Sequence, residues 1–166
     1  MTSETIFALQ FALSLTVFGI LTAWFVVPWL DTLPDHKVLA VLIAPHTFRH
    51  IGLTFLVASV TAPTMPREFA IAAGYGDLAA GLLAIAALLA LLRRWRGAIF
   101  ATWLFNVVGS LDLVYALQHV GVVRQMGPTW FIPTFLVPLL LISHALIFHR
   151  LLSGRYGFVS RSFASE

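Results

Sequence analysis

The chain has 166 residues, of which 60% are hydrophobic and only 10% are charged, and its mean hydropathy is +0.93. Soluble domains carry about 25% charged residues, so these few charges cannot cover the surface of a soluble fold of this size. The composition excludes an ordinary soluble enzyme, a disordered chain and a coiled coil. The absence of cysteine excludes disulfides and thiolate metal sites. We therefore expect an all-α integral membrane protein.

Five hydrophobic stretches are long enough for transmembrane helices, which need about 20 apolar residues each. They cover residues 5–30, 38–63, 68–92, 98–119 and 129–152. The connecting segments are too short to hold a soluble domain. The sequence thus predicts one five-helix transmembrane domain over residues 1–152, followed by a polar tail over residues 153–166.

The second of these spans contains unusually polar sequence. Its apolar run over residues 51–62 cannot cross about 30 Å of hydrocarbon at about 1.5 Å per residue. The helix must therefore begin earlier in the chain. We expect it to carry His50 and Arg49 into the membrane.

The basic residues are distributed unequally between the two sides of the predicted bundle. One side has Lys37, Arg49, Arg93, Arg94, Arg96, Arg150, Arg155 and Arg161, and the other has Arg67 and Arg124. Because cytoplasmic segments retain Lys and Arg, this bias places the N-terminus outside and the C-terminus in the cytoplasm of an inner membrane. The basic residues form no continuous stripe, so we expect no nucleic-acid partner.

Several spans carry a polar side chain at a similar depth, counted from their outer ends. Ionisable groups inside a bilayer are costly, face the interior of a bundle and often mark a site. Asp112 lies nearer the outer face than the others. The predicted ligand-binding pocket comprises His46, Arg49, His50, Asp77, Asn106, Asp112 and His144.

Helical periodicity indicates which of these side chains face one another. A step of about 100° per residue places His46, Arg49 and His50 on one stripe of the second span. Glycines flank Asp77 on its own face of the third span, and small residues of this kind allow close helix packing. We therefore expect Asp77 to point into the bundle.

Each of these groups also has a purely structural interpretation. Arg49 and Asp77, with an axial offset of about 5–6 Å, can form an ion pair whether or not they belong to a site. Asp112 either shares acid–base chemistry with Asp77 or, as we favour, hydrogen-bonds Tyr115 or a neighbouring helix. The position of His46 near the end of its span also fits an interfacial histidine.

We expect the pocket to bind or pass a small ligand, either an anion or a lipid-soluble molecule, with Arg49 as its charge partner. Asp77 and the histidines would exchange protons. One alternative is a redox protein or enzyme that holds haem or a metal through His50 and His144. Another is an accessory subunit of a membrane complex. The expected partners are the lipid bilayer, a small molecule or ion, and a second copy or a complex partner. No catalytic motif decides whether the chain is an enzyme.

Overall fold

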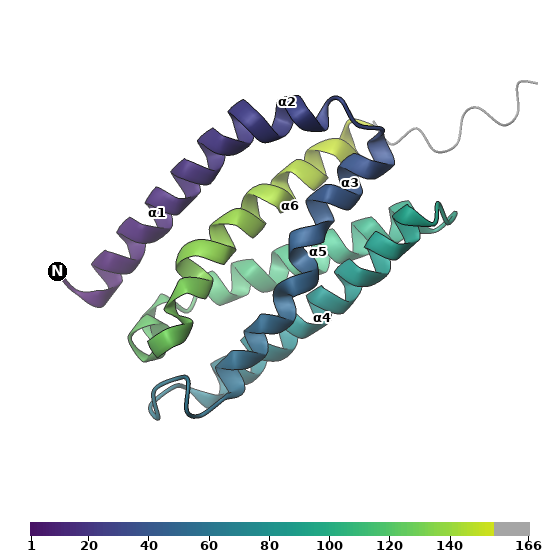
Figure 1. Ribbon diagram of the computed structural model, residues 1–166. Coiled ribbons are helices and arrows are strands. Elements are labelled where there is room, and N and C mark those ends of the chain that lie inside the picture. Colours follow the sequence, from purple (N-terminus) through teal and green to yellow (C-terminus); the bar gives the residue numbers. More distant parts are fainter. Residues whose placement is uncertain (155–166) are drawn as a thin grey trace, which may run out of the picture.

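The computed structural model describes residues 1–154, which form an up-and-down bundle of helices joined by short connections (Figure 1). The described residues contain no strand, which confirms the all-α prediction. Within residues 1–154, five helices are long and apolar enough to cross a membrane, namely Ser3–Leu30, Asp35–Leu56, Arg67–Leu92, Ala98–Leu117 and Gly127–Leu152. The predicted polar tail lies, from residue 155 onward, outside the described residues.

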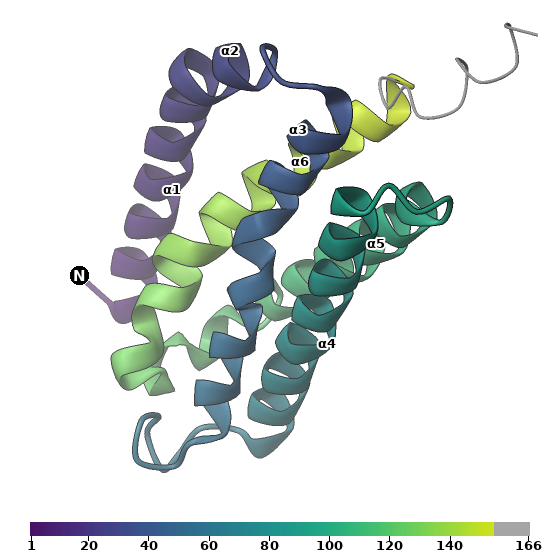
Figure 2. The same ribbon diagram turned by 45° about the vertical axis from the view of Figure 1, so that its right-hand side comes forward.

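The first long helix changes geometry before its proline. It comprises α1 (Ser3–Leu21), the π-helical turn η1 (Thr22–Val26) and α2 (Val27–Leu30). Pro28 has no backbone N–H to donate to the preceding turn, and a wider π-helical turn precedes it. α1 runs beside α6 (Val137–Leu152) (Figures 1 and 2), and most of its side chains are exposed.

The second long helix combines α3 (Asp35–Ile43) with a 13-residue 3-10 helix, η2 (Ala44–Leu56). Thr47, His50 and Thr54 each donate a side-chain hydrogen bond to the carbonyl three residues earlier, at 2.7, 3.1 and 2.8 Å. A 3-10 helix rises about 2.0 Å per residue, so η2 covers about 26 Å, for which an α-helix needs about 17 residues. This helix therefore ends at Leu56, earlier than the predicted residue 63.

The next two helices, α4 (Arg67–Leu92) and α5 (Ala98–Leu117), form a hairpin. Small residues recur along one buried face of α4 and bring its backbone close to η2 and α5. This face follows the 3.6-residue period expected from the sequence. Its buried members are Ala70, Ala73, Gly74, Ala80, Gly81, Ala84 and Ala87.

The last long helix begins with irregular turns. After η3 (Val120–Gln125) come η4 (Gly127–Trp130), the π-helical η5 (Ile132–Leu136) and α6. Gly127 has φ +52°, a conformation that favours glycine, and the Ala62 amide donates to the Gln125 carbonyl at 2.9 Å. These connections close the end of the bundle that also holds the N-terminus, called here the N-terminal end (Figure 2).

Within residues 1–154, two large apolar clusters fill the two ends of the bundle. One cluster packs towards the N-terminal end and includes Phe7, Phe55, Phe69, Ala73, Val123, Met126 and Ile132. The other fills the opposite half, called here the C-terminal end, and includes Leu30, Leu39, Ile43, Ala87, Leu91, Ala98, Phe105 and Ile147. A smaller third cluster comprises Leu113, Val137 and Leu140.

Candidate functional site

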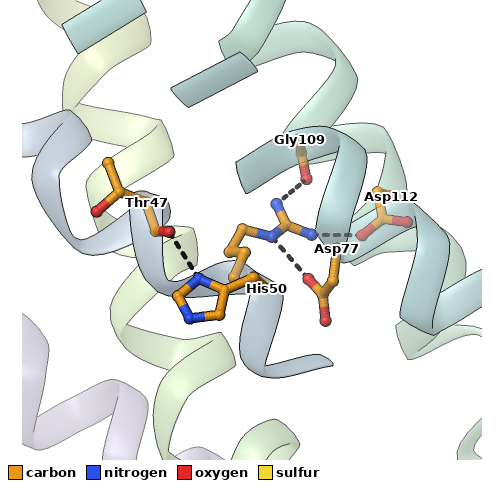
Figure 3. A network of polar contacts seen from close by, with 6 residues as sticks. Thr47, His50, Asp77, Gly109 and Asp112 are labelled. Atoms are coloured by element: carbon orange, nitrogen blue, oxygen red, sulfur yellow. Dashed lines mark hydrogen bonds and ion pairs between the residues drawn. The ribbon is translucent and has the colours of Figure 1, made fainter. Parts of the chain in front are cut away.

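A buried arginine lies at the centre of the bundle and bridges three helices (Figure 3). Arg49 of η2 donates from Nε to Asp77 Oδ1 of α4 at 2.7 Å and from Nη1 to the Gly109 carbonyl of α5 at 2.9 Å. Its Nη2 donates to Asp112 Oδ2, also on α5. The side chain of Arg49 is only 1% exposed. We call Arg49, Asp77, Gly109 and Asp112 the arginine centre.

Glycines make room for the arginine centre. A Cβ atom at Gly52 would overlap the Asp77 carboxylate, and one at Gly76 would overlap the Asp112 carboxylate. At Gly109 a Cβ would lie 2.9 Å from His144 Cε1 and 3.1 Å from Arg49 Nη1. The close approach of η2, α4 and α5 therefore depends on residues without side chains at these positions.

The arginine centre holds more negative than positive charge. With Arg49, Asp77 and Asp112 ionised, one positive and two negative groups leave a formal charge of −1. Charge removed from water is costly unless it is paired, so the centre favours the uptake of one further positive charge. A proton or a small cation can supply it.

Two buried histidines lie beside the arginine centre. The rings of His46 and His144 have their centroids 4.2 Å apart, and the Phe105 ring packs on both. The Asn106 amide nitrogen donates to the His144 carbonyl at 3.3 Å, so its oxygen accepts from His144 Nδ1 at 2.6 Å. His144 Nε2 and both ring nitrogens of His46 have no hydrogen-bond partner within residues 1–154. These three nitrogens are therefore buried polar atoms that no described residue satisfies.

The structure brings together six of the seven predicted pocket residues and leaves His50 apart, on the exposed surface. The cause is the 3-10 geometry of η2, in which residues three apart share a face. His46, Arg49, Gly52 and Phe55 are the buried residues of η2. The α-helical period used for the prediction placed His50 on the wrong face. His46 is fully buried and is not an interfacial residue.

The geometry does not suit the predicted haem or metal ligation. His50 and His144 do not face each other, because His50 is exposed and donates from Nδ1 to the Thr47 carbonyl. A metal between two imidazoles at about 2.0 Å from each nitrogen would hold the centroids about 5–6 Å apart. The rings of His46 and His144 are closer than that. Within residues 1–154 no three His, Asp or Glu side chains are grouped to hold a metal ion.

A cavity of about 40 Å³ extends from the arginine centre towards the N-terminal end. The carboxylates of Asp77 and Asp112 lie on its wall, and His119 is its other polar lining residue. The remaining wall is apolar and includes Pro133, where the last long helix departs from α-helical geometry. Sequence reasoning missed the aromatic members Phe7, Phe55 and Phe69, which come from three different helices and carry no local signal.

An ion pair connects α1 with η3 at the N-terminal end of the bundle. Arg124 of η3 donates from Nε to Glu4 of α1, and this hydrogen bond raises the pKa of Arg124. At the C-terminal end, Arg150 of α6 donates to Asp31 after α2. These two pairs are remote from the arginine centre and join the first helix to the rest of the bundle.

The fold and the site thus define, over the described part of the chain, an all-helical bundle with five helices of membrane-spanning length around a buried arginine. Residues 6–152 match a protein family described as a domain of unknown function, DUF8737, and the chain belongs to that family. The match spans nearly all of the five long helices. No curated protein and no solved structure matches the chain.

Proposed function

We propose that the chain is an integral inner-membrane protein whose arginine centre binds or passes a small ligand and exchanges protons as it does so. The observation that carries this proposal is the contact between the arginine centre and a cavity. A purely structural ion pair needs no free space beside its carboxylates, whereas Asp77 and Asp112 lie on a cavity wall.

The distribution of basic residues supports the membrane orientation. Setting aside the buried Arg49, the C-terminal end carries Lys37, Arg93, Arg94, Arg96 and Arg150, and the N-terminal end carries Arg67 and Arg124. Cytoplasmic ends retain basic residues, so the N-terminal end faces outward in this proposal. Exposed Trp29 and Trp95 near the C-terminal end fit a membrane-interface position.

Arg49 and Asp77 also line a second cavity of about 20 Å³ against η5 and α6. The cavity of about 40 Å³ reaches the arginine centre from the N-terminal end. It is lined by η3 and η5 residues such as Val123 and Ile132, which lie at the N-terminal end. Towards the C-terminal end, Ile43, Ala84, Phe105 and Ile147 pack without exposed area. In this conformation a ligand therefore approaches from outside, and release to the cytoplasm requires the apolar cluster to open.

Proton exchange would use groups from every helix around the centre. Arg49 and His46 lie on η2, Asp77 on α4, Asp112 and His119 on or just after α5, and His144 on α6. The formal charge of −1 on the arginine centre favours proton uptake when no other cation is bound. The buried histidine nitrogens provide neighbouring acceptor positions.

We expect at least one class of small solute to raise the unfolding temperature of the purified protein in nanodiscs. A ligand that binds only the folded protein stabilises it, so binding shows as a higher unfolding temperature. The screen uses cations, neutral molecules and anions at pH 5.5 and pH 8. The shift should depend on pH and should disappear in Asp77→Asn.

The matched control is Asp31→Asn, which also removes one carboxylate from an ion pair but at the C-terminal end. This control should keep the wild-type shift. The proposal fails if no solute class stabilises the wild-type protein, or if the two variants respond identically.

A further inference from the structure

Arg49 is the only cation in the centre of the described bundle, and it is not part of the cavity wall that Asp77 and Asp112 line. Three of its five guanidinium N–H groups donate, to Asp77, to the Gly109 carbonyl and to Asp112. An anion in the cavity would meet the two carboxylates, because Arg49 itself does not line that cavity. The charge of the cavity wall therefore opposes an anionic ligand.

Each carboxylate has one oxygen that accepts no hydrogen bond within residues 1–154, Asp77 Oδ2 beside Gly52 and Asp112 Oδ1 beside Gly76. Asp77 uses Oδ1 and Asp112 uses Oδ2 to accept from Arg49. The side chain of Asp77 is 13% exposed and that of Asp112 is 15% exposed. These carboxylates are acceptors for a hydrogen-bond donor that carries positive charge.

The rest of the cavity wall is suited to a small apolar group. Phe7, Phe55 and Phe69 contribute aromatic rings, whose faces attract cations and whose bulk excludes water, and no Lys or Arg lines the cavity. A volume of about 40 Å³ holds about three water-sized groups, since one needs about 10–15 Å³. A ligand of this size has only a few non-hydrogen atoms.

We propose that the ligand of this cavity is a small alkylammonium ion, whose ammonium group binds the carboxylates of Asp77 and Asp112 while its alkyl group lies against the phenylalanines. This inference rests on the proposed function and narrows its ligand to one charge class. Binding brings the formal charge of the centre from −1 to zero, so the alkylammonium ion and a proton compete for the same centre.

Three probes of similar size and different charge test the inference, namely ethylammonium, ethanol and acetate. Each is titrated into the full-length protein in nanodiscs, with calorimetry and the unfolding temperature as readouts and empty nanodiscs as the blank. We expect ethylammonium to bind at least tenfold more tightly than ethanol and acetate to show no binding. Because protons compete, the affinity for ethylammonium should fall when the pH is lowered from 8 to 5.5.

Two variants locate the binding. Asp112→Asn should weaken ethylammonium binding at least tenfold, whereas Asp31→Asn should leave it unchanged. Ala116→Leu keeps every charge and fills the cavity, because Ala116 is a lining residue, and it should also abolish binding. This second variant keeps the test decisive even if Asp112→Asn does not fold.

The outcomes separate this inference from the proposed function. If ethanol or acetate binds at least as tightly as ethylammonium, or if Ala116→Leu binds ethylammonium normally, the alkylammonium assignment is overturned. Another solute class that stabilises the wild-type protein and not Asp77→Asn would leave the proposed function standing. If no solute of any class binds, both proposals fail.

Discussion

Replacing Arg49 with methionine is expected to destabilise the folded protein by about 3–5 kcal/mol, because it leaves two buried carboxylates without their counter-charge. The loss also removes the three hydrogen bonds that connect η2 with α4 and α5. Equilibrium unfolding of the purified protein in mixed detergent micelles measures the change. Arg49→Lys should restore only part of the stability, since a single ammonium group cannot reproduce the planar arrangement of guanidinium donors.

A charge-balanced variant separates the loss of pairing from the loss of packing. Combining Arg49→Met with Asp77→Asn and Asp112→Asn removes all three charges and should regain most of the lost stability. A single Arg49→Met variant as stable as the wild type would show that the arginine centre is not buried as described. A triple variant less stable than Arg49→Met would show that electrostatic imbalance is not the cause.

A methyl group at Gly52 should also have a large effect, although alanine is normally the better helix residue. The new Cβ would occupy the space of the Asp77 carboxylate of α4. Arg49, which lies on η2 like Gly52, holds this carboxylate in place by a hydrogen bond. Overpacking of this kind costs about 1–3 kcal/mol, and it should also displace Asp77 from the cavity wall. We therefore expect Gly52→Ala to lower both the free energy of unfolding and the affinity for the ligand.

Gly19→Ala is the matched control, since no atom outside its own helix lies within 4 Å of the new Cβ. There the substitution should be neutral or stabilising by up to about 1 kcal/mol, as expected for a helical glycine whose new Cβ meets no neighbour. Equal effects of the two substitutions would mean that Gly52 does not pack on Asp77. The comparison uses the same unfolding measurement for both variants.

The long apolar helices were predictable because their length and hydropathy are local properties of the sequence. The inward position of Asp77 was also predictable, since small residues repeat at the α-helical period around it along α4. The Arg49–Asp77 ion pair was predictable from the inward position of Asp77 and from the small axial offset between the two residues, which an arginine side chain can span. The contact is present at 2.7 Å.

The position of His50 was not predictable by the same reasoning, because the reasoning assumed 3.6 residues per turn. Long 3-10 helices are uncommon, so a sequence of this kind favours the α-helical period. A signal did exist in the sequence: His46, Arg49, Gly52 and Phe55 follow a three-residue spacing. Two of these four residues, His46 and Arg49, are polar, however, so hydrophobicity alone does not reveal the face.

The participation of Asp112 and His46 depends on distances across the bundle. Asp112 was expected to hydrogen-bond Tyr115 or a neighbouring helix, and the second outcome is confirmed, with Arg49 of η2 as the partner. That contact requires α5 to approach closely at Gly109, whose carbonyl also accepts from Arg49. The burial of His46 likewise depends on packing by Phe105 and His144, which come from other helices. Sequence spacing within one helix carries no information on such contacts.

The central claim is that an acidic cavity leads from the outside to the arginine centre, and the lack of native cysteine permits a direct measurement. Ala116→Cys places one thiol on the cavity wall, and Ala87→Cys places one in the apolar cluster of the C-terminal end as a control. Intact cells receive membrane-impermeant thiol reagents that are cationic or anionic. We expect Ala116→Cys to react from outside, faster with the cationic reagent, and Ala87→Cys to stay unmodified. Reaction of Ala116→Cys only in opened cells, or faster reaction with the anionic reagent, would contradict the claim.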